Sequence, residues 1–233
     1  MDLLVYLIGT IVQTLDLTCI LLKTSELSYD KMERYYPDFL SQLGDFNLEV
    51  LERSEYSIYA LSRDLRFTYF NPAWFRFATK NGFDKAAAKK LALGSSVLKW
   101  IRGLRLKCYL RNNYKKVIRT GKIWHFDYEC SSPSEYRLFH QIVHPLYKKS
   151  GVLIINTEMF KLPMSTMNRK TFRVIEDRYI QSDGQIVHCG NCRHTRRADE
   201  PDLWDWVPEW IDKLPANYRL SICPTCEHLY KET

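Results

Sequence analysis

Glycine is scarce in this chain of 233 residues, and several patterns that carry catalysis are absent. Only 9 residues are glycine, and they form no glycine-rich loop of the kind that cradles phosphate groups. The sequence also offers no nucleophile paired with a base, and no metal-ligand set that leaves a position open for water. We therefore expect a protein that is not an enzyme.

Cysteine is present but is not arranged for disulfides. The 7 cysteines are too few and too unevenly placed for a secreted disulfide scaffold. Cys19, Cys108 and Cys130 stand alone in apolar or helical surroundings, where buried and inert thiols are expected. This usage is typical of a reducing compartment, so we expect a cytoplasmic protein.

A long uninterrupted apolar run is also lacking. The stretch 3–22 is rich in apolar residues, but Gln13, Asp16 and several threonines interrupt it. An Asp near the centre of a membrane span costs roughly 2.5–3.5 kcal/mol, and no basic residue precedes the stretch as in a signal peptide. Leucine and isoleucine recur at helical spacing, so residues 1–44 are predicted to be a helical segment that packs on the next domain or on a second copy. A membrane anchor and a true start at Met32 are the other interpretations.

The positive charge is unevenly distributed. The net charge is +7, but residues 51–160 alone carry 20 Lys or Arg and 8 Asp or Glu, a net of +12. The cysteine-rich end, 186–233, carries 6 and 8, a net of −2. The run 99–122 holds nine basic residues and no acid. It is interpreted either as a solvated helix face or as a surface for an acidic partner, nucleic acid or anionic lipid.

Residues 45–160 change periodicity repeatedly, as a mixed domain should. A helix is predicted over 71–80 with Asn71 as its cap, and a longer amphipathic helix over 105–119 that ends at Gly121. Strands are predicted at 57–61, 66–70, 122–130, 136–147 and 151–157. This order predicts an α+β fold, in which helices lie on one face of an antiparallel sheet.

The segments SIYALSRDLRFTYFNPAW, RTGKIWHFDYECSSPSEYRLFHQIVHPLY and GVLIINT closely resemble a PAS domain over residues 45–160. The resemblance is especially close to a bacterial group that carries "YxNPAW" and "YECSSP" segments. It implies a five-stranded sheet that clasps a ligand or relays the state of a partner, and it implies no catalysis.

A ligand pocket in such a domain would be lined by aromatic side chains, although aromatics also fill the core of any domain. The candidate pocket residues are Tyr69, Trp74, Phe77, Trp100, Trp124 and His140. Heme would need an axial ligand, for which His125, His140 and His144 are available. The identity of any ligand stays open.

Two C-x2-C pairs mark the C-terminal part of the chain. Residues 161–180 are predicted to be a linker, and 181–233 a small zinc-ribbon-like module that a hairpin turning at Ser182–Gly184 introduces. The pairs Cys189/Cys192 and Cys223/Cys226 can complete a tetrahedral set of four thiolates, which favours structural zinc. The alternatives are two disulfides, a redox pair or a rubredoxin-like iron site.

Residues around the cysteines support the metal interpretation. Trp204, Trp206, Val207, Trp210 and Ile211 are predicted to form the small apolar core that the module needs. His188, His194 and His228 flank the cysteines, but four thiolates already suffice, so the histidines are expected beside the site or at the surface. The same bacterial group carries a similar tail with "WDWVPEW" and "SICPTC".

These features predict a non-catalytic signal-sensing or adaptor protein. Its PAS domain would sense a ligand or dimerise, and its zinc module would dock a protein partner. We expect a homodimer through the PAS domain or the N-terminal helix, and no membrane partner. The alternative is a transcription-type regulator that contacts nucleic acid, which the net charge of −2 over 186–233 disfavours.

Overall fold

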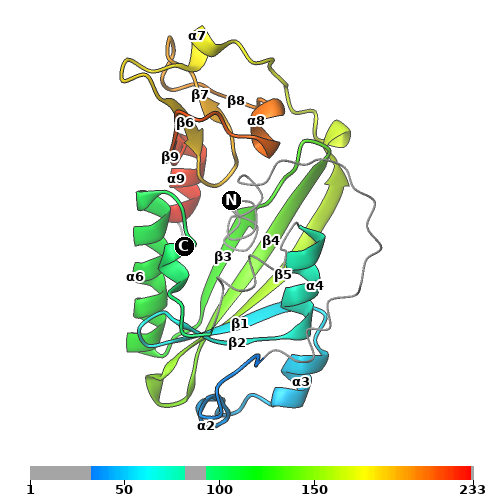
Figure 1. The fold of residues 1–233 in the computed structure, drawn as a ribbon, viewed down its shortest axis with the longest axis vertical. Helices are drawn as coiled ribbons and strands as arrows, with labels where there is room; N and C mark the ends of the chain where they lie inside the picture. The colour runs from blue at the N-terminus through cyan, green and yellow to red at the C-terminus, as the bar shows by residue number, and fades with distance from the viewer. Residues whose placement is uncertain (1–32, 82–92, 232–233) are drawn as a thin grey trace.

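The computed structural model describes residues 33–81 and 93–231. It consists of a sheet domain (residues 33–163), a connector (164–185) and a cysteine module (186–231), and the module sits at one end of the sheet domain (Figure 1). Most of the helical segment predicted over 1–44 lies outside the described residues. Within the described part, no helix is both long and apolar enough to cross a membrane.

The sheet domain contains the five predicted strands. They are β1 (Ser57–Ser62), β2 (Phe67–Phe70), β3 (Trp124–Glu129), β4 (Glu135–Pro145) and β5 (Gly151–Pro163). Their spatial order is β2-β1-β5-β4-β3, and every neighbouring pair is antiparallel. The predicted antiparallel sheet is therefore confirmed. Strand β5 is longer than the predicted strand 151–157, and it ends three residues beyond 160, the predicted end of the domain.

Two helices pack on the inner face of the sheet, α4 (Pro72–Lys80) and α6 (Leu104–Thr120) (Figure 1). The predicted capping of α4 is confirmed, because Asn71 Oδ1 accepts a hydrogen bond from the Trp74 amide at 2.9 Å. The end of α6 is also as predicted: Gly121 has φ 72, a left-handed conformation that glycine adopts without strain.

The outer face of the sheet is partly covered as well, and one of the helices that cover it, at 39–42, falls within the helical segment predicted over 1–44 to pack on the next domain. The short helices α2 (Phe39–Gln42) and α3 (Leu48–Arg53) bury Phe39 and Leu51 in a second apolar cluster on the outer side of β1, β2 and β5. Three 3-10 turns complete the elements of this domain and its connector: η2 (Val97–Lys99), η3 (Tyr147–Lys149) and η4 (Met164–Met167).

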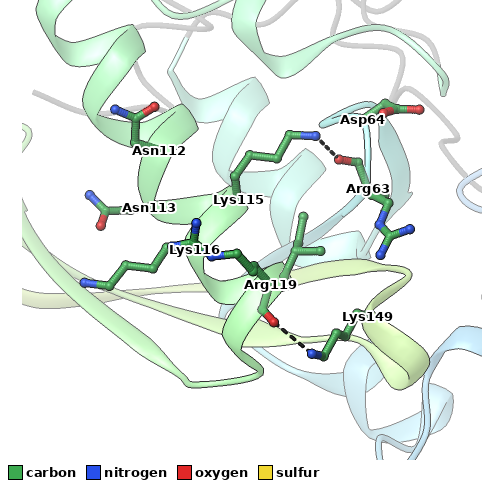
Figure 2. A pocket seen from close by; sticks show the side chains of 9 residues that line it. Arg63, Asp64, Asn112, Asn113, Lys115, Lys116, Arg119 and Lys149 are labelled. Carbon is green, nitrogen blue, oxygen red and sulfur yellow. Dashed lines mark hydrogen bonds between the residues drawn. The ribbon is translucent and has the colours of Figure 1, made fainter.

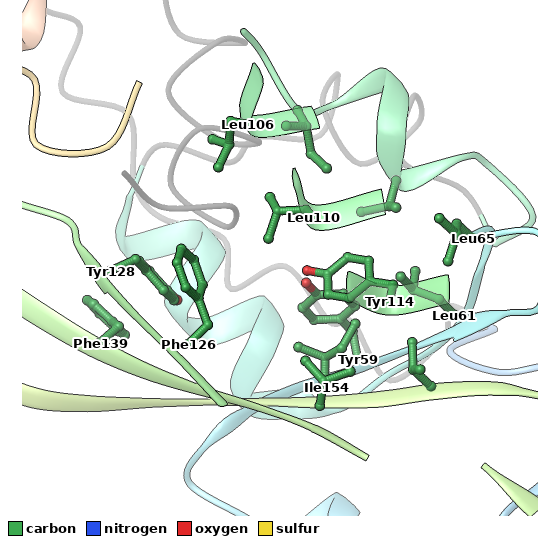
Figure 3. Packing of buried hydrophobic residues seen from close by; sticks show 14 of the residues in the cluster. Tyr59, Leu61, Leu65, Leu106, Leu110, Tyr114, Phe126, Tyr128, Phe139 and Ile154 are labelled. Atoms are coloured by element: carbon green, nitrogen blue, oxygen red, sulfur yellow. The ribbon is translucent and has the colours of Figure 1, made fainter. Parts of the chain in front are cut away.

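The main core lies between the sheet and α6. Figure 3 shows Leu106 and Leu110 of α6 above the strands, with Tyr59, Tyr114 and Tyr128 among the side chains beneath them. All five are almost completely buried. The predicted face of α6 is thus confirmed, because its apolar residues point into the core and its charged residues point away.

The cysteine module is a four-stranded sheet with two short helices around it, and a third short helix, in the connector, packs against it. Its strands are β6 (Ile186–Cys189), β7 (Thr195–Arg196), β8 (Trp204–Asp205) and β9 (Tyr218–Ser221), in the order β8-β7-β6-β9. The helices are α7 (Glu176–Tyr179), α8 (Glu209–Asp212) and α9 (Pro224–Lys231). The prediction of a hairpin before Cys189 is wrong for its first strand, because the helix α7 forms there. The two predicted strands are joined by the single antiparallel bridge between Ile180 and Ile186.

Candidate metal centre

The two cysteine turns lie side by side because the strands that lead into them are parallel neighbours. Strands β6 and β9 are paired so that Cys189 lies opposite Ser221. The first turn then runs from Cys189 to Cys192 at the β6–β7 hairpin, and the second runs from Cys223 to Cys226 at the start of α9. Residues far apart in the sequence are thereby brought to one edge of the small sheet.

The four sulfurs have the spacing of a tetrahedral metal site. All four Sγ atoms lie within 4.8 Å of one another, and each of the four cysteines is buried. A tetrahedron with metal–sulfur bonds of about 2.3 Å would place its sulfurs about 3.8 Å apart. The Cys192 and Cys223 sulfurs are 3.5 Å apart, which is far longer than a disulfide bond of about 2.05 Å. The cluster can therefore bind a metal ion, and its thiols are free rather than cross-linked.

Hydrogen-bond donors surround the sulfurs. The amides of Asn191 and Cys223 both donate to Cys189 Sγ at 3.4 Å, and the Cys226 amide donates to Cys223 Sγ at the same distance. The side-chain amide of Asn191 donates to Cys226 Sγ at 3.3 Å. Burial alone would raise the pKa of the Cys189 thiol, but hydrogen bonds from the other three thiols outweigh it and hold that pKa well below its usual range. The pKa of the Cys192 thiol is raised instead, by hydrogen bonds within the same cluster and by burial, so these contacts favour a thiolate, the form that binds metal, at Cys189 and not at every sulfur.

The histidines next to the cysteines do not complete the ligand set. His194 Nδ1 lies 3.2 Å from Cys192 Sγ, so the imidazole can donate to that sulfur. His188 is buried, and burial lowers its pKa to about 4, so the ring is neutral at pH 7 and shares a hydrogen bond of 3.0 Å with Thr195 Oγ1. His228 is exposed on α9. These positions agree with the expectation that the histidines lie beside the site or at the surface.

The predicted apolar core of the module is present in two pieces. Val207 and Trp210 pack with Tyr179 and Ile186 in one cluster, and Trp206 and Ile211 pack with Met164 in another. Trp204, the fifth predicted residue, is partly buried against the main core of the sheet domain. Both clusters include residues of the connector, which is therefore packed against the module rather than free.

The module also shares the main core with the sheet domain. The four cysteines and Ile222 belong to the same apolar cluster as the residues between α6 and the sheet. Tyr230 of α9 stacks on Tyr109 of α6, with ring centroids 4.4 Å apart, and its ring lies 5.4 Å from that of Phe126 on β3. The candidate metal centre thus rests directly on the sheet domain.

Polar contacts reinforce this interface at three places. Arg102 donates a hydrogen bond to the Tyr218 hydroxyl, and Arg105 pairs with Glu227 at 3.5 Å. On the other side, Arg169 of the connector makes a two-pronged pair with Glu129 of β3, at 2.8 and 3.2 Å. The same guanidinium lies 4.5 Å from the centroid of the Trp206 ring, a cation–π distance. Arg169 therefore links the connector, the sheet and the module.

The candidate pocket residues do not share one side of the sheet. Trp74 and Trp124 belong to the main core, and Phe77 and Trp100 pack against it. Tyr69 instead lies in the outer cluster, where it stacks on Phe39 at 4.8 Å and donates to Glu52. His140 points outward too, within 2.5 Å of Asp127, because it alternates with the buried Phe139 and Gln141. The prediction that Tyr69 and His140 line one pocket with the other four residues is therefore wrong, because these two side chains lie on the opposite face of the sheet.

The three histidines considered as heme ligands share this outward direction. His125 and His140 lie on the outer face with their ring nitrogens 3.1 Å apart. His144 packs edge-on against Phe46 on the same face, with ring centroids 5.3 Å apart. None of the three faces the core beneath α6, since inward and outward positions alternate along β3 and β4.

A buried polar network in the main core was not predicted. Gln141 donates to Asn156 Oδ1 at 2.9 Å, and the Tyr128 hydroxyl donates to the same oxygen at 2.9 Å. The Tyr114 hydroxyl donates to Gln141 Oε1 at 3.1 Å. Figure 3 shows the Tyr59 hydroxyl beside the Tyr114 hydroxyl. The sequence does carry one sign of this network, because the polar Gln141 lies between Phe139 and Val143 at positions that face the same side of the strand.

No protein-family model matches the sequence, and no curated protein is significantly similar to it. Among solved structures, the chain is similar to a PAS domain from Colwellia psychrerythraea, at 11% identity and a TM-score of 0.36 over 48% of this chain and 92% of that one. It is also similar to the PAS domain of the Cronobacter turicensis RpfR quorum-sensing receptor in complex with C12:0, at 17% identity and a TM-score of 0.34 over 48% of this chain and all of that one.

A third similar structure is the phage VqmA–DPO complex, at 9% identity and a TM-score of 0.34 over 52% of each chain. All three similarities fall within about half of this chain. Because these identities and TM-scores are low, we assign the fold from the strand order and the helices of this chain itself.

Proposed function

We propose that this chain is a non-catalytic sensory or adaptor protein, in which a PAS-type sheet domain senses a ligand or mediates dimerisation. A zinc ion held by Cys189, Cys192, Cys223 and Cys226 stabilises the module that passes the state of the sheet domain to a protein partner. Zinc is favoured because the set of four buried thiolates leaves no coordination position for water and suits a structural ion.

The observation that carries this proposal is the shared core. A change in the packing between α6 and β3 must move Tyr109 or Phe126, and both are in contact with Tyr230 of α9. Cys226 lies on the same helix as Tyr230, and Cys223 directly precedes that helix. A signal received in the sheet domain therefore has a physical route of packed side chains to the module.

The arginines of the module favour a structural role over nucleic-acid reading. Arg197 pairs with Asp205 at 2.8 Å and with Glu200 at 3.1 Å. Arg193 donates to the Ile211 carbonyl at 3.1 Å, and Arg196 donates to the Pro201 carbonyl at 2.9 Å. Side chains that are engaged inside the module are poorly placed to bind phosphates, so a nucleic-acid regulator stays the weaker alternative.

Native mass spectrometry of the purified full chain, combined with metal analysis, tests the proposal. We expect one zinc ion per chain, and a bound small molecule or a dimer mass that reports the function of the sheet domain. Cys223→Ser should lose the zinc, whereas the matched control Cys108→Ser, a free thiol on α6, should keep it.

Two results would contradict the proposal. Iron in place of zinc, or zinc retained by the Cys223→Ser variant, would overturn the assignment of the metal site. A monomer with no bound molecule under all conditions tried would overturn the sensory role of the sheet domain.

A further inference from the structure

A basic hollow lies at the end of α6 that is remote from the cysteine module. It has a volume of about 770 Å³ and lies between the C-terminal half of α6, the β1–β2 turn and the β4–β5 turn. Its cationic lining residues are Arg63, Lys115, Lys116, Arg119 and Lys149. One carboxylate, that of Asp64, lines it as well, which leaves the hollow with four more positive charges than negative ones.

These five cations have no ion-pair partner among residues 33–81 and 93–231. Elsewhere in the structure, arginines such as Arg34, Arg169 and Arg197 pair with carboxylates. None of the five pairs with a carboxylate in the part of the chain that the structure describes. Like charges gathered in one place repel one another, so their concentration here is unfavourable for folding and points to an anionic ligand.

Two of the ammonium groups are held in place by backbone carbonyls. Figure 2 shows Lys115 Nζ donating to the Arg63 carbonyl at 2.6 Å, and Lys149 Nζ donating to the Arg119 carbonyl at 2.8 Å. Each bond joins two of the segments that bound the hollow. Lys115 and Lys149 are therefore held in position before a ligand arrives, which lowers the entropy lost when they bind it.

The turn that carries Lys149 has an unfavourable backbone. Lys148 has φ 51 and Lys149 has φ 59, a left-handed region in which glycine and asparagine are preferred and lysine is uncommon. Lysine at these positions costs stability that Asn or Gly would save. The presence of lysine at these positions is therefore better explained by the charge of its side chain than by the conformation of the turn.

We propose that this hollow binds a small soluble molecule that carries two adjoining phosphate groups. A phosphate monoester carries about −1.5 to −2 charges at pH 7, so two phosphates match the excess of four positive charges. The cations come from three segments of the chain and line one hollow, together with the buried Ile118, which suits a small anion. This site is separate from the metal centre and does not depend on the proposed sensory function.

Calorimetric titration of the full chain with inorganic pyrophosphate, at 0.15 M salt, tests the proposal. Arg119→Gln and Lys149→Asn should each weaken binding by roughly fivefold or more, since each removes a charge-assisted hydrogen bond. Arg111→Gln is the matched control: it makes the same change on an exposed part of α6 that does not line the hollow, and its affinity should stay near that of the wild type.

The variant Lys149→Asn separates binding from folding. Asparagine tolerates positive φ, so its melting temperature should equal or exceed that of the wild type while pyrophosphate binding falls. Absence of pyrophosphate binding to the wild type would overturn the proposal. It would also be overturned if Arg111→Gln weakened pyrophosphate binding as much as Arg119→Gln does. A single-stranded oligonucleotide that bound more tightly than pyrophosphate, and that lost affinity equally in both variants, would overturn it too and would indicate a nucleic-acid surface along α6.

Discussion

At the scale of single residues, Asn71 joins three segments of the sheet domain. Its side-chain oxygen accepts hydrogen bonds from the amides of Trp74 and Ile58, and its side-chain nitrogen donates to the carbonyls of Leu51 and Tyr56. The residue is completely buried. Removing this side chain would leave several buried backbone groups without partners, and each such group is costly.

We predict that Asn71→Ala lowers the free energy of unfolding by about 3 kcal/mol or more, because a helix cap and further buried hydrogen bonds are lost together. The matched control is Asn47→Ala, which removes the exposed cap of α3 and should cost about 1 kcal/mol. Urea denaturation of both variants measures the difference. Equal losses in the two variants would contradict the role given to Asn71.

The same residue shows what sequence patterns can and cannot predict. Its capping of α4 follows from the segment NPAW, because a cap and its helix are adjacent in the chain. Its bond to the Leu51 carbonyl spans 20 residues, and no local pattern predicts such a contact. Tyr69 shows the second limit: alternation from the buried Phe67 would turn it inward, but a register shift between Ala60 and Leu61 turns it outward.

At the scale of elements, α9 is the helix that joins the candidate metal centre to the sheet domain. It begins at the second cysteine pair and presents Tyr230 to α6 and β3. Its N-terminal end also lies against Cys223, whose sulfur accepts a hydrogen bond from the Cys226 amide in the first turn of the helix. The sequence predicted the cysteine turn, but it gave no sign of which surface the helix would cover.

We predict opposite outcomes for two substitutions of Tyr230. Tyr230→Ala should destabilise the protein by about 3 kcal/mol or more, since a large aromatic side chain is removed from the shared core. Tyr230→Phe keeps the ring and removes a buried hydroxyl that has no hydrogen-bond partner among the residues the structure describes, so it should be neutral or stabilising. Thermal unfolding of both variants measures this, and a comparable loss in the two would show that the ring does not anchor α9.

At the scale of the whole molecule, the sheet domain and the cysteine module are one packed body rather than two linked ones. From the sequence, the five strands and the helices α4 and α6 were predicted correctly, because each depends on local spacing, and the predicted grouping of the four cysteines is present. The contacts of Tyr230 with Tyr109 and of Arg169 with Glu129 were not predictable, because they join segments that are far apart in the chain. The same distinction explains why the sequence suggested a tail separate from the sheet domain.

Because of the shared core, a metal ion bound at the candidate centre would contribute to packing inside the sheet domain. Free energy of metal binding is free energy of folding where the ligands are not arranged in the unfolded chain. Loss of the metal should therefore release α9 and expose Tyr109 and Phe126, which now lie beneath it. Local opening of this kind is visible as faster exchange of backbone amides.

Hydrogen–deuterium exchange of the full chain, before and after the metal is removed with a chelator, tests this account most directly. We predict that removal accelerates exchange in 186–231 and also in 104–110 and 124–128, whereas α3, which packs on the outer face of the sheet, stays protected. Exchange that rises only within 186–231 would contradict the shared core and show that the module is independent of the sheet domain.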